Sequence, residues 1–199
     1  TTPHAHQIYD AVASVSGISF TDEDLDAEEL GGVVTWTPPT TPERVDAYIL
    51  YLAASLIDVG RSQIGVGSPL GSDFAEVPAE TPVAANTLFV VYTKSTLVEQ
   101  TTPVALTIVD KVSPITNISF PDYDLDEGDL GGVLSWVPPG DFSQVTHYLV
   151  YFAHDTQGSS RTYFANVPIG TENLTVPTET ALSDFTHFVI YTLSSLVEQ

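Results

Sequence analysis

The chain has 199 residues, no cysteine, and 26 acidic against 5 basic side chains, so its formal net charge is −21. This charge disfavours a nucleic-acid backbone or an anionic membrane as partner, because both require clustered Lys or Arg, and the lack of Cys excludes disulfides and thiolate metal sites. No apolar run reaches the ~18 residues of a membrane-spanning helix, so we expect no insertion into a membrane.

The sequence is a tandem repeat. The string LVEQTTP runs from Leu97 to Pro103, while the chain ends in LVEQ and begins with TTP. Residues 1–100 align with residues 101–199 if one single-residue gap is placed near residues 65–68. A period of about 100 residues indicates an array of domains and not a short-repeat solenoid. Because Met is absent even at position 1, we expect a processed product or a segment of a longer protein.

Strand signals fill both repeats, because short alternating segments are separated by Pro, Gly and polar turns, and no helical period is found. In the first repeat the predicted strands are residues 15–20, 32–37, 47–53, 61–65, 74–77, 87–95 and 104–110. In the second repeat they are residues 115–120, 132–137, 146–153, 161–167, 173–176 and 186–194. We therefore predict an all-β protein of two tandem β-sandwich domains, residues 15–110 and 115–199, preceded by a linking strand within residues 1–10.

Two pairs of matching blocks, VTWTPP with VDAYILYL and LSWVPP with VTHYLVYF, resemble strands B and C of fibronectin type III domains, which are immunoglobulin-like sandwiches. The resemblance implies a buried Trp in each repeat and is typical of domains in extracellular fibres and surface arrays. Where such domains often carry a corner tyrosine on strand F, this chain has Phe89 and Phe188. Period-2 alternation predicts a core made of Val34, Trp36, Tyr48, Leu50, Leu52, Phe89 and Val91, and of Leu134, Trp136, Tyr148, Val150, Phe152, Phe188 and Ile190.

An acidic loop in each repeat is the sharpest polar motif. Its pattern D-x-D-x-D places several carboxylates around a turn, and hard oxygen ligands of this kind suit Ca²⁺. The candidate calcium ligands are Asp22, Asp24, Asp26, Glu28 and Glu29, with Asp122, Asp124, Asp126 and Asp129 in the second repeat. The loop is not an EF-hand, since the required Gly and Glu positions differ and no helices flank it. The alternative is a solvated acidic turn that needs no cofactor.

Two N-x-S/T triplets, at Asn117 and Asn173, are candidate N-glycosylation sites, although such triplets also arise by chance. Together with few Lys residues and abundant Thr and Ser, they favour an extracellular or cell-surface protein. The sequence contains no nucleophile elbow, phosphate-binding loop or Ser/His/Asp order, and the five His residues form no site by their spacing. We therefore predict that the protein is not an enzyme.

Two function classes remain open. The first is a structural subunit of an extracellular filament or surface array. The second is a carbohydrate- or protein-binding adhesion module, for which an aligned pair of exposed aromatics would be expected. Tyr123 and Tyr163 are candidates for glycan contact, but the first repeat has Glu23 and Gln63 at these positions. An accessory domain of a hydrolase is a third option.

The count of strands predicts how copies assemble. The second repeat has no counterpart of the strand at residues 104–110, while residues 3–10 align with that strand but precede the first domain. We predict that this segment completes the second domain of a neighbouring copy, head to tail, by donor-strand complementation. The segment consists of Pro3, His4, Ala5, His6, Gln7, Ile8, Tyr9 and Asp10.

The alternation of residues 104–110 also predicts which side chains of the donated strand are buried. Val104, Leu106 and Ile108 form its apolar face, so that His4, His6 and Ile8 would enter the groove. Burial disfavours a charged imidazole, and acidification should therefore weaken the contact. The alternative is a slice of a longer covalent array, in which the preceding domain owns the first ten residues.

Overall fold

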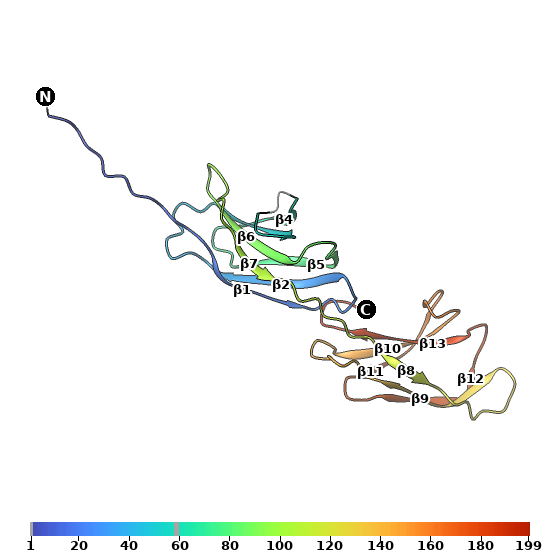
Figure 1. The fold of residues 1–199 in the computed structure, drawn as a ribbon. Coiled ribbons are helices and arrows are strands. Elements are labelled where there is room, and N and C mark those ends of the chain that lie inside the picture. The colour runs from blue at the N-terminus through green and yellow to red at the C-terminus, as the bar shows by residue number, and fades with distance from the viewer. Residues whose placement is uncertain (1, 58–59) are drawn as a thin grey trace. The chain divides into compact units, whose positions relative to one another are not determined.

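The computed structural model of the protein describes residues 2–57 and 60–199; Thr1, the first residue of the predicted N-terminal strand, lies outside these ranges. Within them every helix or strand that forms is a β-strand, and no helix could span a membrane. The prediction of an all-β protein with tandem sandwich domains is confirmed, because each repeat folds into two sheets (Figure 1).

The first repeat builds sheets of three and four strands, in the orders β1-β2-β5 and β4-β3-β6-β7. The strand β3 pairs antiparallel with β4 and β6, and β7 pairs antiparallel with β6. Its strands are β1 (Ser16–Asp22), β2 (Glu29–Thr37), β3 (Ala47–Ala53), β4 (Ser62–Pro69), β5 (Phe74–Pro82), β6 (Leu88–Lys94) and β7 (Val104–Thr107).

The second repeat has the same order with one strand fewer, β8-β9-β12 in one sheet and β11-β10-β13 in the other. Its strands are β8 (Thr116–Ser119), β9 (Asp129–Val137), β10 (His147–Ala153), β11 (Thr162–Pro168), β12 (Asn173–Ala181) and β13 (His187–Leu193). Both β5 and β12 are longer than predicted, because they continue beyond the Val-Pro pair at which the predicted strands end. In β12 the pairing with β9 shifts between Val176 and Thr180, so a bulge accommodates the proline.

By their contacts the residues form two compact units. The first comprises Thr1–Thr21, Val33–Val77 and Val83–Val109, and the second comprises Asp22–Gly32, Pro78–Pro82 and Asp110–Gln199. The predicted domains follow the repeat in the sequence, whereas these contacts group the acidic loop of the first repeat with the second unit. This grouping positions the candidate site described below.

The interior is filled by the inward residues of alternating strands. In β2, Val34 and Trp36 are buried, whereas the neighbouring Val33 is 43% exposed. One face of this part of the strand therefore faces the core and the other faces solvent. Trp36 packs on Tyr48 with ring centroids 5.5 Å apart, and Trp136 packs on Tyr148 at the same distance. The predicted core is confirmed except at Phe188 and Ile190, which are only partly buried.

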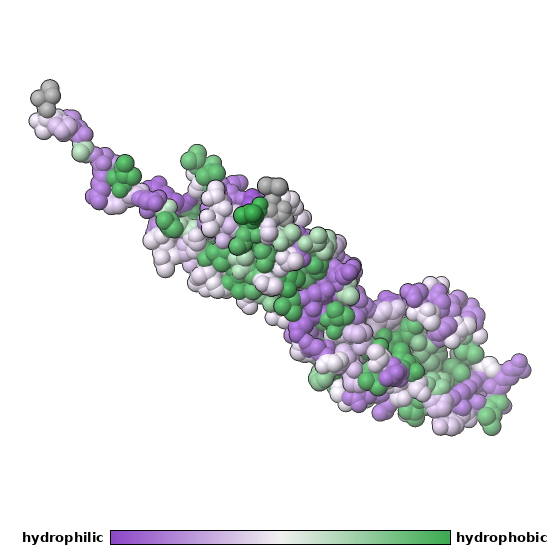
Figure 2. Space-filling model, viewed as in Figure 1, coloured by the Kyte–Doolittle hydropathy of each residue, from purple (hydrophilic) through white to green (hydrophobic). Residues whose placement is uncertain are grey.

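A smaller cluster of buried residues covers the other face of the four-stranded sheet. Ala53, Val90 and Tyr92 form it, and Leu88 and Ala105 pack against it. Figure 2 shows hydrophobic atoms gathered on the visible surface of the first unit, over the sheet that contains β6. The strand β6 is therefore buried on both faces, as its burial pattern shows.

Neighbouring residues of β9 test the alternation directly. Leu134 is 0% exposed and Val133 is 43% exposed. We expect Leu134→Ala to lower the free energy of unfolding by about 2–5 kcal/mol, because it removes buried methyl groups and leaves a cavity, and Val133→Ala to change it by less than about 1 kcal/mol. Urea denaturation followed by tryptophan fluorescence measures both. Equal losses for the two variants would contradict the assigned faces.

Candidate functional site

The two repeats differ most at the edge of the four-stranded sheet. In the first repeat β7 covers the edge of β6, with Phe89 opposite Leu106 and Val91 opposite Val104. In the second repeat β13 pairs with β10 on one side, and no strand of the described residues lies on its other side. Thr192 and Leu193 are paired with the end of the chain, since the N–H of Gln199 donates to the Thr192 carbonyl at 2.9 Å, whereas the backbone groups of the edge before them are open to another strand.

The open edge changes the burial of the core beside it. Phe89 and Val91 are 0% exposed under β7, whereas their counterparts Phe188 and Ile190 are only partly buried. A hollow of about 240 Å³ lies at Ile190, lined also by Pro114, Ile115 and Gln199. The hollow is also lined by Asp26 and Tyr191, so of the β13 edge it touches only the end near Ile190.

The N-terminal segment, which contains the predicted assembly strand, is extended and exposed. Residues 2–10 form no strand, and all of them are exposed (Figure 1). The side chains of Ile8 and Tyr9 are 90% and 77% exposed, and the hydroxyl of Tyr9 donates to Gln7 Oε1 at 2.9 Å. Ile8, which is predicted to face the groove of a neighbouring copy, is thus a large apolar side chain that is exposed to solvent.

The acidic loop between β1 and β2 is held together by its own carboxylates. Asp22 Oδ1 accepts the backbone N–H groups of Asp24 at 3.2 Å and Gly31 at 3.0 Å. Asp24 accepts the N–H of Asp26 at 3.2 Å and, through Oδ2, that of Glu80 at 2.7 Å. The D-x-D-x-D pattern therefore satisfies backbone donors that a tight loop would otherwise leave unpaired.

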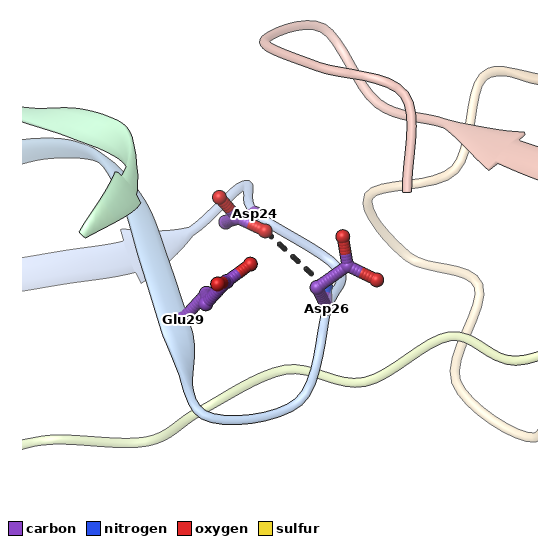
Figure 3. Close-up of side chains that lie close together, drawn as sticks. All are labelled: Asp24, Asp26 and Glu29. Carbon is purple, nitrogen blue, oxygen red and sulfur yellow. Dashed lines mark hydrogen bonds between the residues drawn. The ribbon is translucent and has the colours of Figure 1, made fainter. Parts of the chain in front are cut away.

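The same carboxylates also create a cluster of oxygen atoms. Asp24, Asp26 and Glu29 each offer one oxygen within 4.8 Å of the others, and Figure 3 shows them around the loop. In the second repeat the corresponding cluster joins Asp124 and Asp126 to Glu179. Of the other candidate ligands, Asp22, Glu28, Asp122 and Asp129 belong to neither cluster of the described residues.

Glu179 was not among the candidate ligands. It lies in β12, far from the loop in sequence, and its backbone N–H donates to Asp124 Oδ2 at 2.8 Å. A signal for it exists in the repeat: the strings VPAET and VPTET place Glu80 and Glu179 at equivalent positions. Both residues have a positive φ, 61° and 60°, which bends the strand toward the loop.

Burial makes the two acidic loops different electrostatically. In the first loop burial raises the pKa of Asp22 to about 6, the nearby Asp110 adds to the rise, and three backbone N–H donors oppose it. Burial, with Asp24 and Glu29, also raises the pKa of Asp26. In the second loop the N–H groups of Glu179 and Asp126 lower the pKa of the accessible Asp124. The first loop is thus the one in which negative charge is costly.

A matched pair of arginines, one in each repeat, stacks on tyrosine rings. Arg61 lies over the rings of Tyr51 and Tyr92, at 4.3 and 4.2 Å from their centroids, and forms an ion pair with Glu99. Arg161 repeats this with Tyr151, Tyr191 and Glu198. Glu99 and Glu198 belong to the two LVEQ strings. Each arginine therefore connects this turn, through its ion pair, to the tyrosines of the sheet on which it stacks.

The candidate glycosylation sites are both accessible. Asn117 lies in β8 and Asn173 begins β12, and both residues are exposed. Exposure is required for modification but does not establish it, so these sites stay a prediction.

Comparison with known proteins gives a distant structural likeness. No protein-family model matches the chain, and no curated protein matches it. Among solved structures it is similar to the crystal structure of the FN1–FN3 domains of chicken CNTN1, with 12% identity and a TM-score of 0.39. The match covers 93% of this chain but only 63% of the other. At this identity and score, the sandwich assignment depends on the strand orders themselves.

The raised pKa of Asp22 predicts a dependence of stability on pH. The folded carboxyl binds its proton near pH 6 and the unfolded one near 3.8, so the fold gains stability as the pH falls through this interval. In the presence of a chelator we expect the melting temperature to rise from pH 7 to pH 5, and this rise to be smaller in Asp22→Asn. A variant with the full rise would exclude Asp22 as its source.

The calcium prediction has a matched pair of variants. We expect millimolar Ca²⁺ to raise the melting temperature of the wild type, because the ion would offset the repulsion among Asp24, Asp26 and Glu29. Glu29→Gln should weaken the effect, whereas Glu28→Gln, which removes the same charge outside the cluster, should preserve it. Scanning calorimetry with and without Ca²⁺ measures the shift. The absence of any shift in the wild type would favour the solvated acidic turn.

Proposed function

We propose that the chain is a structural module of an extracellular filament or surface array that assembles head to tail. In this proposal residues 3–10 of one copy add to the open edge of β13 in the next. The observation that carries it is the contrast between β6, whose edge and core are covered by β7, and β13, whose edge is open over the partly buried Phe188 and Ile190.

The internal pairing supplies the register. Carried over by the repeat alignment, the β6–β7 pairs set His6 opposite Phe188, Ala5 opposite Val189 and His4 opposite Ile190. In β7 the side chains of Val104 and Leu106 are partly buried while Thr107 is exposed. The donated strand would then turn His4, His6 and Ile8 inward and Gln7 outward.

The geometry of this contact favours a polymer. The donated segment precedes the first sandwich and the accepting edge belongs to the second, so the two contact surfaces are different. A heterologous contact that does not close on itself propagates along a filament. Covering β13 would also remove an exposed edge, which is an aggregation hazard in a free sandwich.

A non-catalytic, extracellular role completes the proposal. Absence of Cys, the strong negative charge and the accessible Asn117 and Asn173 are compatible with the cell surface. The rival proposal, an adhesion module, has one observation in its favour: Tyr123 and Tyr163 are 73% and 57% exposed. Retention on immobilised polysaccharides by the wild type, and its loss in Tyr163→Ala, would favour this rival.

The strand-addition proposal is tested with two neighbouring substitutions in the N-terminal segment. We expect Ile8→Asp to weaken self-association at least about tenfold, because a buried Ile contributes about 1.5–3 kcal/mol. Gln7→Asp introduces the same side chain on the outward face and should assemble as the wild type does. Sedimentation velocity over a range of concentrations measures association, and electron microscopy shows whether the assemblies are filaments. Equal assembly by both variants would contradict the proposal.

A denaturing gel of native material identifies where the strand comes from. Separate subunits of 21.4 kDa give a band of that mass and support exchange between copies. Only larger species would show a covalent array, in which the following repeat of the same chain supplies the strand. That outcome would overturn the exchange between molecules.

A further inference from the structure

The two acidic loops have equivalent sequences but opposite burial. Leu25, at the tip of the first loop, is 1% exposed, while Leu125 in the second loop is 95% exposed. Within the second unit Leu25 belongs to the core cluster that also contains Trp136, Val145 and Tyr148. The same leucine of the repeat is therefore buried in a core in the first copy and exposed to solvent in the second.

Four contacts hold the first loop inside the second unit. The N–H of Ser113 donates to the Leu25 carbonyl at 3.2 Å, and the N–H of Lys111 donates to Asp22 Oδ2 at 3.0 Å. The N–H of Glu28 donates to Asp110 Oδ2 at 2.8 Å, and the side chains of Asp26 and Gln199 are hydrogen-bonded. The receiving groups lie just before β8 and at the end of the LVEQ string.

The bare loop already has the conformation of the buried one. Asp122 Oδ1 accepts the N–H groups of Asp124 at 3.1 Å and Gly131 at 2.9 Å. Asp124 accepts the N–H of Asp126 at 3.2 Å, as Asp24 does in the first loop. A loop that is organised before binding loses little conformational entropy when it docks.

The first unit contains a cavity at the equivalent receiving position. Its volume is about 910 Å³, and its lining includes Asp10, Ala11, Ala13, Val45 and Gln100. By the repeat alignment these are the counterparts of Asp110, Lys111, Ser113, Val145 and Gln199. All five counterparts either bond the buried loop or share the core cluster with Leu25, so the cavity has the lining that the loop requires.

The cavity lining contains two cations beside two acidic residues, Asp10 and Glu43. Arg44 and Lys94 both line the cavity, and neither forms an ion pair within residues 2–57 and 60–199. The other three cations of the chain, Arg61, Lys111 and Arg161, are all in ion pairs. A partner rich in carboxylates would pair the two that remain, and the second loop carries Asp122, Asp126 and Glu127 on exposed positions.

A glycine and a leucine give a second point of fit. Gly31 leaves room for the side chain of Leu196 in the second unit, since a Cβ there would lie 2.5 Å from Leu196 Cδ2. The counterpart of Leu196 in the first repeat, Leu97, is 90% exposed. The counterpart of Gly31 is Gly131 in the bare loop, so the same leucine-on-glycine contact is available to a second copy.

From these observations we propose that the loop 122–131 of one copy docks into this cavity of the next copy, with Leu125 as the buried contact. Ala13 and Ala11 would donate their N–H groups to the Leu125 carbonyl and to Asp122, and Asp10 would accept the N–H of Gly128. Leu97 would pack on Gly131. The inference rests on the head-to-tail assembly proposed above, but it assigns a different surface, so the two can fail separately.

Sedimentation velocity of full-length variants tests the docking. Leu125→Asp changes only the loop, and Arg44→Glu/Lys94→Glu changes only the cavity. Each variant alone should self-associate at least about tenfold more weakly than the wild type. Mixed in equal amounts, at a concentration where neither variant associates alone, they should associate with each other as tightly as the wild type does, because the intact cavity of one variant accepts the intact loop of the other. The control is Val66→Asp in β4, since Val66 is 97% exposed; it should assemble as the wild type does.

Comparison with Ile8→Asp separates the two proposals. Full association by Leu125→Asp together with loss in Ile8→Asp would overturn the docking and leave strand addition standing. The reverse result would support the docking and overturn strand addition. A wild type that remains monomeric at millimolar concentration would overturn both. Because Leu125 is exposed, unchanged melting temperatures are expected for its variant, and the measurement reports association and not folding.

Discussion

The pairing of β6 with β7 is the constraint on which the rest of the structure depends. The last strand of a sandwich covers the edge of its neighbour and the core side chains beside it. In the first repeat β7 does so, and Phe89 and Val91 are fully buried. In the second repeat the counterparts Phe188 and Ile190 remain partly exposed beside an open edge. Equivalent positions of the two repeats are therefore buried to different extents.

The acidic loops show how one local structure can serve two surroundings. Carboxylates of the D-x-D-x-D pattern accept backbone N–H groups at nearly the same distances in both repeats. The loop therefore folds by local bonds and needs no partner. Burial then decides its electrostatics: the pKa of Asp22 is raised to about 6, while that of the accessible Asp124 is lowered. Calcium binding and docking are both ways in which such a loop could be neutralised.

The arginine–tyrosine stacks use two of the five cationic side chains of this acidic chain. Arg61 and Arg161 each use two rings and one carboxylate, and they fix the turn that carries the LVEQ string. Gln100 and Gln199 are the last residues of the two strings. The repeated string is therefore a structural element of both sandwiches.

Much of this was determined by the sequence itself. Period-2 alternation and the position of the tryptophans identify the strands and the inward residues, because each side chain of a strand faces one side or the other. Alignment of the repeats shows that the second repeat has no counterpart of β7, and that residues 3–10 supply this strand stays a prediction. Strand ends were less well predicted: the strand expected to end at Val176 continues to Ala181, because a bulge accommodates the proline between them.

Only the tertiary structure decided the role of residues that are distant in sequence. Glu179 joins the second oxygen cluster because β12 lies beside the loop, where the N–H of Glu179 donates to Asp124. Leu25 and Leu125 occupy the same place in the D-x-D-L-D pattern, and this pattern does not distinguish them. Their burial, 1% against 95%, depends on whether another folded surface is present, because hydrophobic burial is a property of the whole packed unit and not of the residue.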